Sequence, residues 1–212
     1  MKFDPRTLGA LGLISLCAAM AAAPARSHEP AASMPTSMAA SMPTRSTDEK
    51  IADALRAAPD FVGQNATIMD RDMKTLLREG SPEWTCVPSD PAAPWPNPMC
   101  GDQTTMQWFS DFMHGRAPTI DRIGISYMLM GETGADFYHP EIHLPPPGKS
   151  WYRAGPHLMF VFPQSAGDIL KGIGNDVSSG FAYARPFKGA QPLLVVPVAR
   201  PGELIETKKA AP

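Results

Sequence analysis

The sequence predicts one α+β domain, a mainly antiparallel sheet with two or three short helices and one disulfide-stapled, proline-rich loop. Three observations support this fold class. Residues 123–130 and 158–162 alternate as strands do and are mostly apolar or small on both faces, which is typical of central strands. Residues 46–58 and 102–114 carry apolar side chains at helical spacing. Six prolines within residues 81–101 exclude a helix there.

Both predicted helices begin at capping residues. Ser46 and Glu49 have the S-x-x-E spacing of a capping box, and Pro59 ends the first helix. Asp102 caps the second helix, and we expect Trp108 at the margin of its apolar stripe. The stripe consists of Met106, Phe109, Phe112 and Met113.

Residues 66–79 fit two structures. Their apolar positions roughly follow a helical stripe that closes at Gly80, but they also fit two short strands around the polar turn 70–72. The hairpin is favoured.

The C-terminal half predicts one more helix and two more strands. Residues 165–171 are expected to be helical because Ser165 and Asp168 stand in capping-box positions. Strands are expected at 181–184 and 193–198, and a polar tail from Arg200 onward.

Residues 1–25 are predicted to be a cleaved export signal. Lys2 and Arg6 precede an apolar run, and Ala23-Pro24-Ala25 offers the small residues that signal peptidase accepts. The run is short for a membrane span, and no later stretch is long and apolar enough to cross a bilayer. We therefore expect cleavage after Ala25 and a soluble protein in the periplasm or outside the cell.

A low-complexity segment follows the signal. Residues 26–45 are rich in Ala, Ser, Met, Pro and Thr, and this composition predicts a disordered linker because it buries little apolar surface. Residues 46–212 are expected to form a single globular domain with a short polar C-terminal tail. Met34, Met38 and Met42 recur every four residues, and thioethers are ligands of Cu(I). Copper handling is therefore one hypothesis for the linker, and incidental methionine in a repetitive segment is the alternative.

The charge balance argues against nucleic acid as a partner. Residues 1–25 hold two basic residues and one acidic one, which leaves 17 basic and 20 acidic residues in the mature chain. A formal charge of −3 without a basic run gives no attraction to phosphates or to an anionic membrane.

Two cysteines enclose most of the proline-rich segment. A bond between Cys86 and Cys100 closes a loop of 15 residues, worth about 3 kcal/mol by chain-entropy arguments. Metal-bound thiolates are the competing interpretation, but the spacing lacks a C-x-x-C partner. The disulfide is favoured.

Histidines and a carboxylate suggest a metal site. In an extended chain His139, Glu141 and His143 point the same way, and His157 at the start of a strand completes a set suited to zinc or another divalent ion. The alternative is a solvated loop of locally bonded histidines, with His157 at a sheet edge.

Short blocks resemble a group of uncharacterised bacterial exported proteins. The blocks are Leu77–Gly80, Trp84–Cys86, Pro98–Cys100, Arg122–Leu129 and Gly155–Met159. The resemblance spans roughly residues 60–198 and implies an exported single domain without a known activity. It does not include the segment from His139 to His143.

No catalytic motif stands out. The sequence has no G-x-S-x-G elbow, P-loop or dinucleotide fingerprint. We therefore expect an exported, non-catalytic binding or interaction module without an established cofactor. The alternatives are a metal-dependent hydrolase that binds its metal through His139, His143 and His157, with Glu141 as ligand or base, and Cu(I) handling through the linker.

Overall fold

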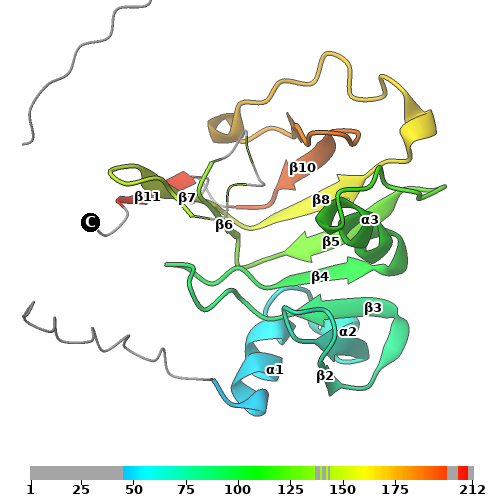
Figure 1. Ribbon diagram of the computed structural model, residues 1–212, viewed down its shortest axis with the longest axis vertical. Helices are drawn as coiled ribbons and strands as arrows, with labels where there is room; N and C mark the ends of the chain where they lie inside the picture. Colours follow the sequence, from blue (N-terminus) through cyan, green and yellow to red (C-terminus); the bar gives the residue numbers. More distant parts are fainter. Residues whose placement is uncertain (1–44, 137–138, 140–141, 143, 200–204, 210–212) are drawn as a thin grey trace, which may run out of the picture. The chain divides into compact units, whose positions relative to one another are not determined.

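The computed structural model (Figure 1) describes residues 45–136, 139, 142, 144–199 and 205–209. The helices in these ranges are α1 (Thr47–Leu55), α2 (Asp60–Gly63) and α3 (Gln103–Met113), with 3-10 turns at Gln164–Ala166 and Val177–Ser179. The strands of a larger sheet are β1 (Ala66–Met69), β2 (Leu76–Arg78), β3 (Ser81–Val87), β4 (Met99–Asp102), β5 (Gly124–Met128), β8 (His157–Val161), β9 (Tyr183–Arg185) and β10 (Leu193–Pro197). A smaller sheet consists of β6 (Glu132–Gly134), β7 (Ser150–Ala154) and β11 (Ile205–Lys209).

The strand order confirms the α+β fold class. The larger sheet has eight strands in the order β2-β1-β3-β4-β5-β8-β10-β9, and the smaller has three in the order β11-β7-β6. Within the described ranges, β1 and β3 pair in parallel and the other neighbours pair antiparallel. None of the helices in these ranges is both long and apolar enough to cross a bilayer.

Local signals placed the start of α1 and the first hairpin correctly, but α1 ends at Leu55 rather than at Pro59, which instead precedes the unpredicted helix α2. The capping box is formed, because Ser46 Oγ accepts from Glu49 N at 3.2 Å and Ser46 N donates to Glu49 Oε2 at 2.7 Å. After α1 the chain turns, and Ala57 O accepts from Leu129 N just beyond β5. Residues 66–79 form the hairpin β1–β2, and Asp70 N donates to Thr75 O at 2.8 Å across its turn.

Two adjacent residues of β4 show that α1 and α3 cover opposite faces of the larger sheet. Cys100 packs with Ala54 of α1 in one core cluster. A Cβ added to Gly101 would lie 2.9 Å from the Met106 sulfur of α3. Because successive strand residues point to opposite faces, the sheet has an α1 side and an α3 side.

Each side has its own core. The α1-side cluster consists of Ala54, Ala57, Ala58, Val62, Ala66, Ile68, Cys86 and Cys100. The α3-side cluster consists of Trp108, Met128, Met159, Val161, Tyr183, Phe187, Leu193 and Val195. The first cluster lies over β1, β3 and β4, and the second lies over β5, β8, β10 and β9.

Trp108 is the centre of the α3 interface, so the prediction that placed it at the margin was wrong. Its side chain is fully buried, stacked on Phe112 at a centroid distance of 5.5 Å and edge-on to Phe187 at 5.1 Å. Met113, assigned to the apolar stripe, is 67% exposed. Phe187, which follows β9, contacts both Trp108 and Phe112, so the buried face of the helix includes Trp108.

The short helix expected at 165–171 is absent. The chain instead makes a 3-10 turn over Gln164–Ala166 and two further turns, and Gly167 has a φ of +58° and a ψ of −133°. This conformation lies outside the helical region and interrupts the backbone before Asp168 can cap a helix. Ile169 is 53% exposed, so its side chain adds little packing that would favour a helix here.

Two segments expected to be irregular contain strands. The proline-rich segment 81–101 contains β3 and most of β4, which pair from Trp84↔Asp102 to Val87↔Met99. The irregular part is therefore the turn between the two strands. The C-terminal region was expected to be a polar tail, but β11 pairs along β7 from Ile205↔Ala154 to Lys209↔Ser150. Polar composition does not prevent pairing, because the pairing uses backbone groups.

One hairpin passes from the larger sheet into the smaller one. β5 pairs with β8 up to Met128↔His157, and β6 pairs with β7 from Glu132↔Ala154. The register therefore changes by one residue at the bend. Gly131 permits this geometry with a φ of +83°, and a Cβ there would lie 2.3 Å from Ala154 O.

Cys86 and Cys100 stand directly opposite each other on β3 and β4 and form the predicted disulfide. Both are fully buried in the α1-side core. The bond therefore joins the ends of the proline-rich turn at the point where α1 packs on the sheet.

Reduction of the Cys86–Cys100 bond should lower the free energy of unfolding by about 3 kcal/mol, because the unfolded chain regains loop entropy. Urea unfolding of the wild type with and without a reductant measures this difference. The C86A/C100A variant should lose at least as much, since it also removes buried sulfur atoms. Equal stability of the oxidised and reduced protein would contradict the prediction.

Candidate functional site

Four polar side chains from four strands meet at the bend of the long hairpin. They are Glu132 of β6, Tyr152 of β7, His157 of β8 and Arg185 of β9, and we call them the ion cluster. The cluster thus connects the smaller sheet to the far strands of the larger one.

Arg185 is the centre of the ion cluster. Its Nη1 forms an ion pair with Glu132 Oε2, and its Nη2 donates to the Tyr152 hydroxyl at 2.8 Å. The guanidinium carbon also lies 5.4 Å from the centroid of the Phe187 ring. The Arg185 side chain is only 3% exposed, so its charge depends on these partners.

A backbone carbonyl two residues earlier, that of Gly155, holds His157 in one tautomer. Nδ1 lies 2.7 Å from the carbonyl oxygen of Gly155, which can only accept, so Nδ1 carries the proton. Nε2 of the neutral ring is then an acceptor, 4.0 Å from Glu132 Oε2 and without a hydrogen-bond partner among the described residues.

The pKa shifts in the cluster follow from burial and from the Arg185–Glu132 pair. Burial lowers the pKa of His157, and the Glu132 carboxylate only partly opposes this. Burial would raise the pKa of Glu132, but Arg185 lowers it overall. Burial would lower the pKa of Arg185, but Glu132 raises it overall. The pKa of Tyr152 is raised by burial and by Glu132.

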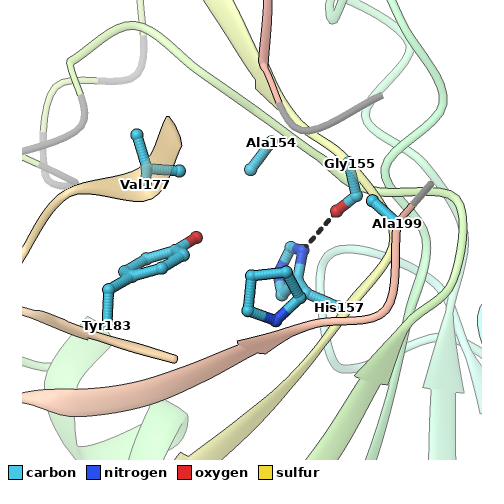
Figure 2. Close-up of a pocket in the computed structure, with 7 residues that line it drawn as sticks. Ala154, Gly155, His157, Val177, Tyr183 and Ala199 are labelled. Carbon is cyan, nitrogen blue, oxygen red and sulfur yellow. Dashed lines mark hydrogen bonds between the residues drawn. The ribbon is translucent and has the colours of Figure 1, made fainter. Parts of the chain in front are cut away.

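A small pocket lies against the cluster. Figure 2 shows Val177 and Tyr183 on one side of it, and His157 with Gly155 on the other. Its enclosed volume of about 10 Å³ is room for about one water molecule. Such a pocket suits a bound water better than an organic ligand.

The predicted metal ligands fall in two different environments where the structure describes them. His139 is exposed and its N–H donates to Asp136 Oδ1 at 3.2 Å, whereas His157 is buried in the ion cluster. Glu141 and His143 lie outside the described residues, as does the methionine linker. Within the described part of the chain, no three His, Cys, Asp or Glu side chains are grouped to hold a metal ion. The zinc and copper hypotheses remain predictions.

The α1 side of the larger sheet carries a continuous apolar surface that sequence reasoning did not anticipate. Two rows of paired residues cross strands β5, β8, β10 and β9. The first row is Ile125, Phe160, Leu194 and Ala184, and the second is Tyr127, Leu158 and Val196. Tyr127 pairs with Cys100, which fixes these rows on the α1 side. We call these seven side chains the apolar face.

The apolar face is partly exposed, whereas the opposite side of the same strands is buried. All seven residues have intermediate exposure. Their neighbours on the α3 side, such as Met159 at 3% and Val195 at 1%, are almost fully covered. α1 packs on β2, β3 and β4, whereas α3 packs on β3, β4, β5 and β8. The part of the α1 side that α1 covers therefore stops at β4, next to β5, the first strand of the apolar face.

Alternation extends the apolar face at both ends. Ile123 precedes β5 in phase with Ile125 and is 53% exposed. Val198 follows β10, its N–H donates to Pro156 O at 2.8 Å, and its side chain is 51% exposed. The Trp84 ring borders the face, with its centroid 5.5 Å from that of Tyr127.

No protein-family model, curated protein or solved structure matches the chain. The site must therefore be interpreted from its own geometry. Of its two parts, the ion cluster is enclosed and internally bonded, and the apolar face is accessible to a partner.

Removing one member of the ion pair should destabilise the fold strongly. Arg185→Met leaves the Glu132 carboxylate without its ion-pair partner, and we expect a loss of about 3–5 kcal/mol in urea unfolding. The double variant E132L/R185M should recover most of this loss, because it leaves no unpaired charge. Additive losses in the double-mutant cycle would contradict the coupling.

Stability should fall between pH 7.5 and pH 5.5 because His157 is buried in its neutral form. Its folded pKa lies below the unfolded value of about 6.5, so the unfolded chain binds more protons and stability is lost as pH falls through that value. The slope for one proton is at most about 1.4 kcal/mol per pH unit. Thermal unfolding across this range measures it.

The variant H157N keeps a donor toward the Gly155 carbonyl but cannot titrate, so its stability should vary less with pH in this range. H139N, at an exposed position, is the matched control and should behave as the wild type. The same pH dependence in all three proteins would show that His157 is not the titrating group.

Proposed function

We propose that this protein is an exported, non-catalytic binding module whose apolar face engages an apolar surface of a protein partner. The observation that carries the proposal is the continuous, partly exposed apolar face, with Ile123 and Val198 more than half exposed at its ends. Soluble proteins rarely expose contiguous apolar patches of this kind unless the patch is an interaction site. Here every side chain of the two rows is apolar apart from the Tyr127 hydroxyl, which suits an interface core.

The proposed location is the periplasm or the exterior of the cell, after cleavage at Ala25. The Ala23-Pro24-Ala25 pattern and the disulfide between Cys86 and Cys100 support export, since disulfides persist in oxidising compartments. Residues 26–45 would then link the new N-terminus to the domain.

The rigidity of the apolar face favours binding over catalysis. Its strands are anchored on the other side by the α3-side core, and at the bend by Arg185 and Glu132. A partner therefore meets a preformed surface and needs little reordering of the backbone.

The fluorescent dye 8-anilinonaphthalene-1-sulfonate, which brightens on exposed apolar surfaces, tests the proposal. We expect dilute mature protein to bind the dye and F160S/L194S to lose most of the fluorescence, because two central side chains of the face become polar. The control I169S/F181S alters two residues that are 53% and 78% exposed but lie outside the face, and should retain the signal. Equal signals from the wild type and F160S/L194S would contradict the proposal.

A further inference from the structure

We propose that β9 and Pro197 protect the outer edge of β10 from pairing with a strand of another molecule, and that the Arg185–Glu132 ion pair holds β9 in this position. The chain needs this protection because β10 is prone to aggregate. The segment 189–199 contains no ionisable residue, and β10 within it begins with four consecutive apolar residues. Apolar, uncharged strands readily pair with strands of other molecules when one of their edges is exposed.

The backbone of β10 has one edge toward β8 and one toward β9. Just after β10, Val198 N donates at 2.8 Å to the carbonyl oxygen of Pro156, which precedes β8. Successive residues of an antiparallel strand turn their N–H groups to opposite sides, so the even-numbered residues of β10 face β8 and the odd-numbered ones face β9. The odd-numbered residues are Leu193, Val195 and Pro197.

β9 covers the outer edge of β10 at two of these three positions. Leu193 pairs with Arg185. Val195 pairs with Tyr183, the first residue of β9, so no residue of β9 lies opposite Pro197. Proline has no N–H, and the edge therefore offers no backbone donor to an incoming strand at the position where β9 is missing.

β9 is itself a poor template for another strand. It stands at the end of the strand order in the described part of the larger sheet and has only three residues. Its middle residue, Ala184, turns its N–H away from β10, where Gly174 O accepts it at 2.8 Å. Short edge strands whose outward groups are already bonded resist edge-to-edge pairing.

Side chains hold β9 in place, because a strand of three residues makes few backbone bonds. Arg185 Nη1 forms the ion pair with Glu132 of β6, and Nη2 donates to the Tyr152 hydroxyl of β7 at 2.8 Å. Both partners belong to the smaller sheet, so Arg185 fastens β9 to strands outside the larger sheet. Loss of the guanidinium should therefore release β9 while β8 still covers the other edge of β10.

Residue-resolved hydrogen exchange of the mature, disulfide-bonded protein tests the role of Arg185. In the folded variant R185M, the amides of Leu193 and Val195 should exchange about ten times faster or more than those of Leu194 and Val196, which stay bonded to β8. In the wild type all four should be protected. Equal exchange at the four amides of R185M would mean that β9 does not leave separately, and would overturn the proposal.

Thioflavin T fluorescence, which rises on cross-β assemblies, and sedimentation test whether the released edge pairs with other molecules. R185M should assemble faster than the wild type. It should also assemble faster than C86A/C100A, which is destabilised on the α1 side but keeps β9 in place. Assembly at the same rate in R185M and C86A/C100A would overturn the proposal, because it would follow from lost stability alone.

Pro197→Val keeps Arg185 and its partners, so it tests the edge even if R185M fails to fold. The valine restores an N–H on the outer edge of β10, and P197V should assemble faster than the wild type. Pro192→Val is the matched control, because residue 192 is even-numbered and its N–H would face the β8 side. Equal behaviour of P197V and P192V would overturn the proposal.

Discussion

An eight-stranded sheet has two faces to cover, and the elements that the chain provides for them are unequal. The α3 side is sealed over β5, β8, β10 and β9 by a core centred on Trp108. Among the described residues, the α1-side core lies over β1, β3 and β4, where the disulfide and α1 meet. Successive side chains of a strand point to opposite sides of the sheet. Along β5, β8, β10 and β9, alternate residues are therefore buried on the α3 side and partly exposed on the α1 side. The partly exposed apolar face is the direct consequence of this asymmetry.

The ion cluster has a different task, which is to hold the bent hairpin in place. The chain leaves the larger sheet after β5 and returns to it at β8, and neither of the two described core clusters includes a residue of the smaller sheet. Arg185 reaches from β9 to Glu132 and Tyr152 of the smaller sheet. The Arg185 charge is buried, so the loss of its partner Glu132 would leave an unpaired charge in the interior and strongly destabilise the fold. The cluster therefore ties β9 of the larger sheet to β6 and β7 of the smaller one, beside the start of β8.

Local signals predicted the local parts of this structure. The Ser46–Glu49 capping box, the 66–79 hairpin and the Cys86–Cys100 bond depend on residues close in sequence or on simple spacing. Trp108 was misplaced because its partner Phe187 is far along the chain. His157 was grouped with His139 and His143 by proximity in sequence, whereas its neighbours in space come from other strands. The apolar face escaped prediction because an apolar strand residue looks the same whether a helix covers it or a partner does.

Hydroxyl-radical footprinting read by mass spectrometry tests most directly whether the α1 side is open at β8 and β10. In dilute protein, we expect Phe160, Leu158 and Leu194 to be oxidised far faster than the fully buried Trp108, although tryptophan is the more reactive side chain in solution. If these three residues are as protected as Trp108 even in dilute protein, the chain itself covers the apolar face. The face is then not accessible to a partner.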